Sequence, residues 1–390
     1  MDKSVNRETS SPAPSPAGPK ADARPGVSTP APRRLRALAR GLVDWYDGSA
    51  RDLPWRRTRD PYGIWVSEVM LQQTRVEVVS GRWAEFLRRF PDLASLAAAE
   101  ESDVLATWAG LGYYRRARQL HAAARRVVEV HGDTLPSDAA TLRLLPGFGS
   151  YTAGAVASIA FDEKVPAVDG NVERVIARLL ALDVEPKRAA GATVVREVAT
   201  GLLRDESPGT LNQALMELGA TVCTPRSPNC RVCPWRGGCR AHASGTPERW
   251  PLRAARKKSV EVASYAAVVR DGDSLLWRRR PEGVPNAGLW ELPTTEWHPG
   301  TADVHAAHDA LEDLGRQLDR RWRVGEALAS ARHGITHHRI TVVAHAVVDT
   351  GDPVTGEAGR DLRRAPVESA LDWGLTAATR KILDRLPTLI

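Results

Sequence analysis

The chain has 390 residues, 43% of them hydrophobic, which is enough for two ordinary globular domains. It contains no apolar run of the roughly 18 residues that a membrane span needs, and its start lacks the apolar segment of a secretory signal. We therefore expect a protein of the reducing cytoplasm. The formal net charge of +7 comes mostly from arginine and favours a polyanionic partner such as nucleic acid, although a compositional bias gives the same excess.

Residues 1–32 are rich in Pro, Ala and Ser and show no apolar periodicity, which predicts a disordered tail. Asp2, Glu8 and Asp22 argue against a transit peptide.

Residues 33–245 carry helical signals, and no alternating strand pattern occurs there. Ser137 is expected to start a helix that includes Leu142, Leu144 and Leu145. One clear apolar stripe at helical spacing consists of Val172, Val175, Ile176, Leu179 and Leu180. We predict a mainly α domain over 33–245.

Residues 246–258 carry two prolines and a basic run, which is typical of a linker. The pattern then changes to strands at 260–269, 275–280 and 340–348, with helices at 302–320 and 375–386. Asp271-Gly272-Asp273 predicts a hairpin turn between the first two strands. We predict an α+β domain over 259–390.

All cysteines of the chain fall in one short segment with 6-2-5 spacing: Cys223, Cys230, Cys233 and Cys239. Four clustered thiolates suit zinc or an iron–sulfur cluster better than disulfides. Zinc sites more often have two C-x2-C pairs, and this segment has one. The spacing therefore favours iron–sulfur and leaves zinc as the alternative.

The segment Leu145–Thr152 places Pro146, Gly147 and Gly149 between two helical stretches. The proline ends the first helix, and the glycines permit a tight turn before the next helix near Tyr151. Backbone N–H groups at such a helix start can bind a phosphate, although an ordinary helix connection gives the same pattern.

Two carboxylates stand out. Glu68 lies beside the apolar face of a helix, where partial burial would keep a proton on it near neutral pH. Asp169 directly precedes the Val172 helix. Taken alone, each carboxylate also fits a role without catalysis: Glu68 as a solvated helix residue and Asp169 as an N-cap. Together they indicate glycosidic chemistry, with one acid for the leaving group and one carboxylate for the sugar cation.

These motifs, taken in order, resemble the adenine DNA glycosylase (MutY) family, which belongs to the helix-hairpin-helix superfamily together with endonuclease III. The resemblance rests on LPW (53–55), SEVMLQQT (67–74), GLGYY (110–114), LPGFGSYTAGA (145–155), VDGNV (168–172), the cysteine segment and the domain after it. It covers roughly residues 33 to 345. It implies a base-excision enzyme with a 4Fe–4S cluster on the cysteines, acting on adenine opposite 8-oxoguanine or guanine in duplex DNA.

The resemblance also implies roles for the catalytic residues. Glu68 would protonate adenine N7 and later handle the water, while Asp169 would stabilise or trap the sugar cation with support from Asn171. Tyr151 stands where bifunctional relatives have a lysine. Tyrosine has no amine for a Schiff base, so we expect a monofunctional enzyme that leaves an abasic site.

Further implied roles concern DNA. Gln73 and Tyr113 would wedge into the base stack, and Gly147 and Gly149 would contact the backbone. The implied adenine pocket consists of Trp55, Arg56 and Glu217. Plain core aromatics are the alternative interpretation of Trp55 and Tyr113. We expect a monomer that associates with the nucleoid when it binds DNA.

The C-terminal domain resembles a Nudix-like module, marked by Gly288–Pro293. Residues 302–320 lack the R-E-x-x-E-E run that holds magnesium in Nudix hydrolases, so nucleotide hydrolysis is not expected. The family reads 8-oxoguanine with a Phe-Ser-His loop, which corresponds here to Ile335, Thr336 and His337. Isoleucine can wedge but not stack, and threonine keeps a hydroxyl, so we expect lesion recognition to be retained. A hairpin tip with surface histidines is the alternative.

Two other functions remain open at this stage. A thymine or uracil mismatch glycosylase of the same superfamily shares the hairpin and the cluster but generally lacks the C-terminal module. A non-catalytic DNA-binding iron–sulfur protein would not need Glu68 and Asp169 together.

Overall fold

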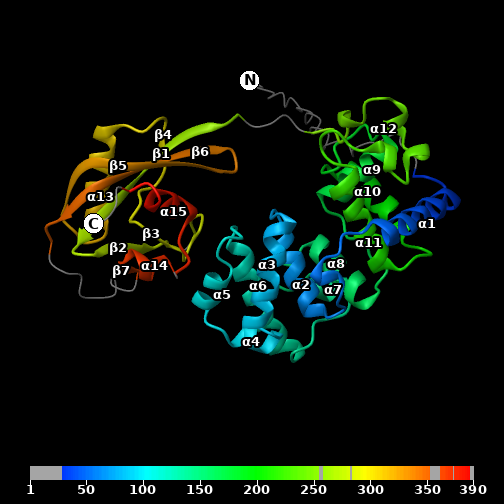
Figure 1. Ribbon diagram of the computed structural model, residues 1–390, viewed down its shortest axis with the longest axis horizontal. Coiled ribbons are helices and arrows are strands. Elements are labelled where there is room, and N and C mark those ends of the chain that lie inside the picture. Colours follow the sequence, from blue (N-terminus) through cyan, green and yellow to red (C-terminus); the bar gives the residue numbers. More distant parts are fainter. Residues whose placement is uncertain (1–28, 254–257, 282, 352–360, 372, 387–390) are drawn as a thin grey trace, which may run out of the picture.

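The computed structural model describes residues 29–253, 258–281, 283–351, 361–371 and 373–386. A helical domain is followed by a domain built on a β-sheet (Figure 1). Most of the predicted tail (1–28) and residues 254–257 of the predicted linker lie outside the described residues. No helix in the described part has both the length and the apolar character needed to cross a membrane.

The first domain is helical, as predicted, and its described residues contain no strand. Its α-helices are α1 (Pro32–Ser49), α2 (Pro61–Leu71), α3 (Val76–Arg89), α4 (Leu93–Ala98), α5 (Glu101–Thr107), α6 (Arg115–His131), α7 (Ala139–Leu142), α8 (Ser150–Phe161), α9 (Gly170–Leu180), α10 (Ala189–Leu202), α11 (Pro208–Glu217) and α12 (Arg240–Ala243). Shorter helical turns are η1 (Pro54–Arg56), η2 (Leu218–Val222), η3 (Cys230–Val232), η4 (Arg236–Gly238) and η5 (Pro247–Arg249).

One helix start differs from the sequence prediction. Asp138, not Ser137, caps α7, because its side chain accepts a 2.8 Å hydrogen bond from the Thr141 amide. The helix is also shorter than predicted, since it ends at Leu142 and leaves Leu144 83% exposed. The prediction of one helix through Leu142, Leu144 and Leu145 was therefore wrong beyond Leu142.

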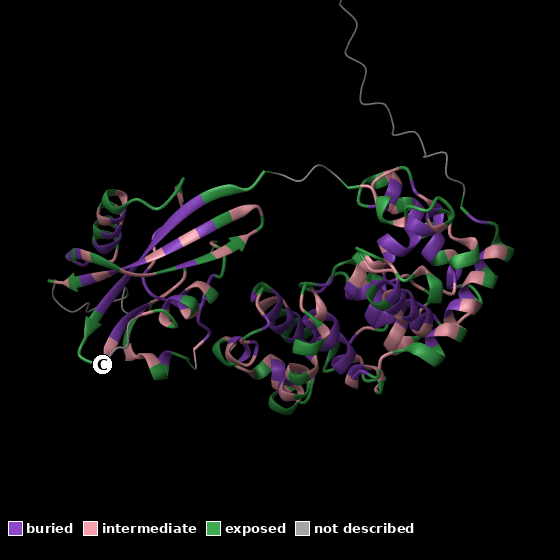
Figure 2. Cartoon of the chain, turned by 45° about the horizontal axis from the view of Figure 1, so that its top comes forward, coloured by how far each residue is buried: buried purple, intermediate pink, exposed green. Residues whose placement is uncertain are grey.

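The helical domain has two hydrophobic cores, visible as two purple interiors in Figure 2. The α2–α8 core contains Trp65, Phe86 and Trp108. The α9–α11 core, which also takes in α1, contains Ile176 and Leu215. Helices α8 and α11 contact each other across the boundary between the cores. That boundary therefore brings together residues far apart in sequence.

The C-terminal domain is α+β, as predicted. Its strands are β1 (Val260–Asp271), β2 (Ser274–Arg279), β3 (Trp290–Glu291), β4 (His298–Pro299), β5 (Trp322–Ile335), β6 (His338–Asp349) and β7 (Leu362–Pro366). The main sheet order is β3-β2-β1-β6-β5, with β1 and β6 parallel. The predicted β1–β2 hairpin is confirmed, with Asp271 opposite Ser274.

Alternation along β1 explains how the sheet is covered on both faces. Val262, Ala266 and Val268 belong to the cluster that includes α14 (Val367–Leu371) and α15 (Ala377–Leu383). The residues between them, such as Tyr265, belong to the cluster of α13 (Val304–Gln317). The sheet is therefore buried between helices, and its β5–β6 hairpin extends beyond them.

The two domains touch through the segment before β3. Leu289 joins the α2–α8 core and is 1% exposed. Arg118 on α6 donates to the Ala287 carbonyl and forms a 3.1 Å ion pair with Glu101. The marker Gly288–Pro293 thus takes part in domain contact as well as in the sheet.

Candidate active site

Glu68 and Tyr151 meet at the boundary between the two cores. Glu68 lies on α2 and is 5% exposed, because nearly the whole circumference of this helix is buried. Tyr151, in the first turn of α8, donates a 2.5 Å hydrogen bond to Glu68 Oε2. The same hydroxyl lies 3.1 Å from the Met216 sulfur on α11. Glu68 is therefore more deeply buried than the partial burial expected from the sequence.

Burial controls the protonation of this pair. It raises the pKa of Glu68 to about 7, against the lowering effect of the Tyr151 hydrogen bond, and the nearby Asp169 charge raises it further. Burial also raises the pKa of Tyr151 well above its usual value. The phenol therefore remains a donor, while Glu68 exchanges a proton near neutral pH.

Asp169 is the N-cap of α9, as the structural interpretation of this residue predicted. Its Oδ1 accepts hydrogen bonds of 2.9 and 2.8 Å from the amides of Asn171 and Val172, and its Oδ2 accepts one of 2.7 Å from the Asn171 side chain. Burial nevertheless raises the pKa of Asp169, against these bonds. The cap fixes a partly desolvated carboxylate within electrostatic range of Glu68.

A chain of hydrogen bonds leads from Asp169 to the cysteine segment. Arg174 donates to the Asn171 side-chain oxygen at 2.7 Å and to the Cys223 carbonyl at 2.7 Å. One turn further, Arg178 donates toward the Cys223 sulfur at 3.4 Å. Gly219 packs so closely that a Cβ there would lie 2.5 Å from the Asn171 Cβ. Helix α9 therefore joins the carboxylate to the cysteine segment.

Of the three residues expected in the adenine pocket, Arg56 and Glu217 form an ion pair within electrostatic range of Glu68, while Trp55 packs edge-on against Trp83. Trp55 is 6% exposed, and Arg56 donates to Glu217 at 2.7 Å. Arg51, which sequence reasoning missed, binds the same carboxylate through two nitrogens at 2.7 and 2.8 Å. Burial would raise the pKa of Glu217, but these arginines hold it at about 2. Only proximity in the fold identifies Arg51.

Gln73 and Tyr113 lie on two neighbouring loops and are exposed, Tyr113 by 59%. Both adopt left-handed backbone conformations, with φ of 60° and 48°. Such values are uncommon for residues other than glycine and cluster at functional sites. The exposure rules out the interpretation of Tyr113 as a core aromatic, whereas Trp55 is buried in the core.

The glycine segment forms the expected tight turn into α8. Gly147 has φ of +75°, and a Cβ there would lie 2.7 Å from the Gln119 Cβ, so a larger residue does not fit. Gly149 is the N-cap of α8 and provides no side-chain cap. The first-turn N–H groups are therefore directed toward a ligand or solvent.

The four cysteines form no disulfide with one another and line one shared pocket, together with Arg178 and His242. Within the described ranges, no group of three or more His, Cys, Asp or Glu side chains is placed to hold a single metal ion. The donor set is thiolates around a shared space, with Arg178 beside one sulfur. These residues fit a group held by four thiolates.

The segment Ile335–His337 forms the tip of the β5–β6 hairpin, where Ile335 pairs with His338. Thr336 is exposed, has φ of 55°, and donates to the Ile335 carbonyl at 2.7 Å. The rings of His337 and His338 lie 4.1 Å apart. The tip therefore presents a hydroxyl and an imidazole beyond the helices that cover the sheet.

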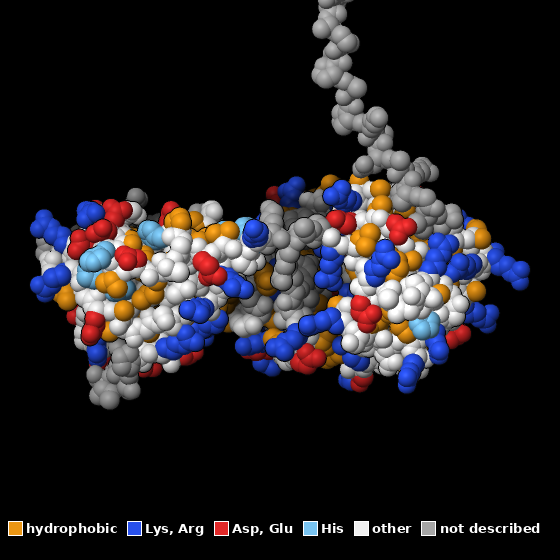
Figure 3. Space-filling model, turned by 90° about the horizontal axis from the view of Figure 1, so that it is seen from above, with side chains coloured by type: hydrophobic (Ala, Val, Ile, Leu, Met, Phe, Trp, Pro, Cys, Tyr) orange, Lys and Arg blue, Asp and Glu red, His pale blue; other side chains and the backbone are white. Residues whose placement is uncertain are grey.

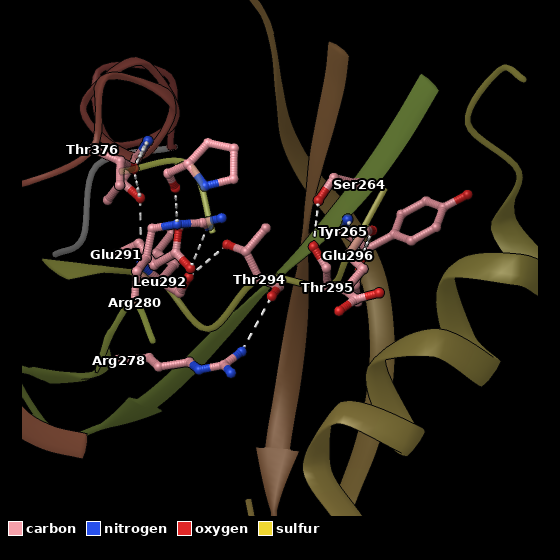
Figure 4. Close-up of polar contacts among 12 residues, drawn as sticks. Ser264, Tyr265, Arg278, Arg280, Glu291, Leu292, Thr294, Thr295, Glu296 and Thr376 are labelled. Atoms are coloured by element: carbon pink, nitrogen blue, oxygen red, sulfur yellow. Dashed lines mark hydrogen bonds and ion pairs between the residues drawn. The ribbon is translucent and has the colours of Figure 1, made fainter. Parts of the chain in front are cut away.

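A second pocket lies in the C-terminal domain beside the tip end of this hairpin, and Ile335 and Ile340 are among the residues that line it. Figure 4 shows Arg280 meeting Glu291, with Arg278 reaching the Thr294 carbonyl. Burial raises the pKa of Glu291 to about 7 against the effect of Arg280. His333 also lines this pocket. Most of these polar groups bond to one another, which favours a structural role.

Lys and Arg side chains are spread over both domains, with Asp and Glu between them (Figure 3). The four arginines of the cysteine segment are exposed: Arg226, Arg231, Arg236 and Arg240. The surface charge is thus suited to a polyanion without one continuous basic face in this view.

Comparison with known proteins identifies the class. Residues 66–196 match the HhH-GPD superfamily of base excision DNA repair proteins, and residues 264–385 match the NUDIX domain. Among solved structures, a thermostable thymine-DNA glycosylase is 27% identical, with a TM-score of 0.49, over 54% of this chain and 98% of that one. The matches to the HhH-GPD and NUDIX family models confirm the predicted fold class.

The chain belongs to the adenine DNA glycosylase family. It is 45% identical to the adenine DNA glycosylase of Mycolicibacterium smegmatis over 53% of this chain and 70% of that relative. The Mycobacterium tuberculosis (strain H37Rv) relative is 43% identical over 59% and 75%. The rat relative is 38% identical over 70% of this chain, which spans 63% of the relative's length.

Proposed function

We propose that this protein removes adenine by hydrolysis from duplex DNA in which the adenine lies opposite 8-oxoguanine or guanine. One observation carries the proposal: a buried glutamate with a pKa of about 7 is hydrogen-bonded to a tyrosine and lies near a second carboxylate. Membership of the adenine DNA glycosylase family supports adenine as the leaving base.

Glu68 acts first as an acid. It transfers its proton to N7 of the adenine, so that the protonated, cationic base accepts the electron pair of the breaking N-glycosidic bond and leaves as neutral adenine. Tyr151 holds the Glu68 carboxyl in place through its hydrogen bond. Because the pKa of Glu68 is about 7, a substantial fraction carries a proton at neutral pH.

Asp169 stabilises the positive charge that develops on the sugar or traps it covalently at C1′. Its orientation is fixed by the helix cap and by Asn171. Glu68, now ionised, then accepts a proton from the water whose oxygen bonds to C1′, and any bond between C1′ and Asp169 breaks in the same step to release the carboxylate. The products are free adenine and an abasic site, and Glu68 has regained its proton.

The enzyme is monofunctional. Strand cleavage through a Schiff base requires an amine at the start of α8, and Tyr151 supplies a phenol instead. Its bond to Glu68 gives it a different task, which is to position the acid.

DNA binding combines several elements. The α8 turn contacts a phosphate, while Gln73 and Tyr113 enter the base stack as the adenine leaves it. Trp55, Arg56 and Glu217 then line the pocket for the base. The protein acts as a monomer, in the cytoplasm on nucleoid DNA.

The four cysteines hold a 4Fe–4S cluster. It would supply a covalent brace for the cysteine segment, whose exposed arginines then meet DNA phosphates. The β5–β6 tip reads the oxidised guanine through Thr336 and His337, with Ile335 as the apolar contact.

Single-turnover release of adenine from a duplex with one A:8-oxoguanine pair tests this proposal. Wild-type protein should release adenine, and Glu68→Gln should not, because the amide cannot donate the proton. A matching T:G duplex distinguishes a thymine glycosylase. The proposal fails if adenine is not released, if thymine is released preferentially, or if Glu68→Gln keeps full activity.

A further inference from the structure

A buried arginine lies directly beneath the two exposed loops that carry Gln73 and Tyr113. Arg116 is in the first turn of α6 and is 8% exposed. Neither its position nor its type marked it in the sequence, where it follows the GLGYY motif among other arginines.

Its guanidinium binds both loops at once. At the junction of α2 with the first loop, Nη1 donates to the carbonyls of Val69 and Met70, in the last turn of α2, at 2.9 Å each, and to that of Gln72, where the loop begins, at 2.5 Å. On the second loop, Nη2 donates to the carbonyls of Leu111 and Gly112 at 2.9 and 3.0 Å. Nη2 also donates to the Thr74 hydroxyl at 3.1 Å, so the two loops are linked a second time.

Within the part of the chain that the structure describes, no carboxylate forms an ion pair with Arg116, and its buried Nε has no hydrogen-bond partner. Burial lowers the pKa of Arg116 to about 10, which still leaves it charged at neutral pH. The compensation comes from carbonyl groups at the C-terminal end of α2, where helix carbonyls lack partners and the dipole is negative. Apart from the Thr74 hydroxyl, the hydrogen-bond partners of this buried cation are backbone carbonyls. Burying a cation without a carboxylate costs free energy of desolvation, which favours a role other than stability.

Arg116 also contacts two aromatic rings, one of which belongs to the exposed Tyr113. The guanidinium carbon lies 5.5 Å from the ring centroids of both Trp108 and Tyr113. Trp108 is fully buried and anchors one side, while Tyr113 is exposed on the other. Gln73 follows directly after the bound Gln72 carbonyl, and its φ of 60° needs such support.

We propose that Arg116 is the positioning residue that locks the Gln73 and Tyr113 loops into one rigid unit, so that both side chains enter the base stack together. This inference rests on the proposed function, because it assigns a task to the base-opening step. Arg116 itself is too buried to touch the target base.

A planar guanidinium is required for this task. Two nitrogens must reach two loops in fixed directions, which a lysine ammonium on a flexible stem cannot reproduce. Arg116→Lys keeps the charge but loses one of the two sets of bonds. Arg116→Met removes the charge and keeps much of the apolar volume. Arg126→Met is the matched control, because it removes the same charge from the exposed side of α6.

The experiment uses two duplexes with the full chain. One has the target adenine opposite 8-oxoguanine, and the other has it opposite an abasic analogue, where no base pair holds the adenine in the duplex. A 2-aminopurine next to the target base reports unstacking by its fluorescence. Arg116→Lys and Arg116→Met should lose this fluorescence rise and slow adenine release from the paired duplex by about 100-fold, as a displacement near 1 Å can.

On the unpaired duplex both variants should recover most of the wild-type rate, and Arg126→Met should match the wild type throughout. Equal slowing on both duplexes would show general damage to the fold and would overturn the inference, as would a normal fluorescence rise in Arg116→Lys. If the wild-type protein opens the stack but releases no adenine, the proposed function fails while the fluorescence still tests Arg116. If it neither opens the stack nor releases adenine, both fail.

Discussion

The Tyr151 hydroxyl donates a 2.5 Å hydrogen bond to a Glu68 carboxyl that has almost no contact with solvent. The bond favours the ionised form of Glu68, whereas burial and the Asp169 charge favour the protonated form. The pKa of about 7 is the balance of these opposing effects. A single hydroxyl therefore tunes the acid on which the proposed chemistry depends.

Removal of that hydroxyl should raise the pKa of Glu68. We expect Tyr151→Phe to move the alkaline limb of the single-turnover pH profile upward by roughly one unit, the equivalent of one hydrogen bond. Tyr62→Phe is the control, since the Tyr62 hydroxyl bonds the Phe90 carbonyl in the same core. A limb that stays in place, or moves to lower pH, contradicts the balance described above.

Glu68 should also make folding stability depend on pH. Its folded pKa of about 7 lies above its ordinary value of 4.5, so the folded protein binds the proton more tightly than the unfolded chain. The stabilising contribution is complete below about pH 4.5 and is lost as the pH rises through 7. The free energy of unfolding of Glu68→Gln should therefore exceed that of the wild type by on the order of 1–3 kcal/mol at alkaline pH.

This gain should disappear at acidic pH, where the wild-type carboxyl is already protonated. Urea denaturation at both pH values measures it, and Glu312→Gln on the exposed face of α13 provides the control. A gain of equal size at both pH values would mean that packing, not ionisation, is responsible.

Loss of the Glu217 charge should destabilise the fold. Its carboxylate is 1% exposed and binds both Arg51 and Arg56, so Glu217→Gln leaves two cations without their partner. We expect a loss of about 3–5 kcal/mol in the free energy of unfolding at neutral pH. The exposed pair of Asp52 and Arg57 is the control, and Asp52→Asn should change little. A small effect of Glu217→Gln would show that the pocket is hydrated.

The cysteine segment should bind iron. Purified protein should be brown and contain about four irons per chain, and Cys233→Ser should lose the colour and the iron together. Arg226→Gln, on the same segment, should keep the colour and weaken DNA binding. If the purified protein is colourless and contains one zinc per chain, the cysteines hold zinc and not an iron–sulfur cluster.

Thr336 should contribute to lesion preference through its hydroxyl. Thr336→Ala should lower the ratio of adenine release rates between A:8-oxoguanine and A:G duplexes, because the donor at the hairpin tip is lost. Thr336→Ser keeps the hydroxyl and should keep the ratio. An unchanged ratio in Thr336→Ala would assign the recognition to other residues.

Much of this arrangement could be predicted from the sequence because it depends on local patterns. The cap at Asp169, the turn at Gly147 and the hairpin at Gly272 follow from backbone chemistry at single positions. Strand β5 was missed because register shifts between Val324 and Ala329 break its alternation. Arg51 and Arg116 were missed for another reason, since their partners come from distant or unpatterned backbone atoms.

The boundary between the two cores also determines how activity is lost when the protein is destabilised. Glu68 is held by one core, whereas Asp169 is held by the other. A small rotation of one core against the other separates the acid from the carboxylate without exposing either interior. Activity should therefore be lost at a lower temperature or denaturant concentration than the one that unfolds the helices. A folded but inactive form then precedes the unfolded chain.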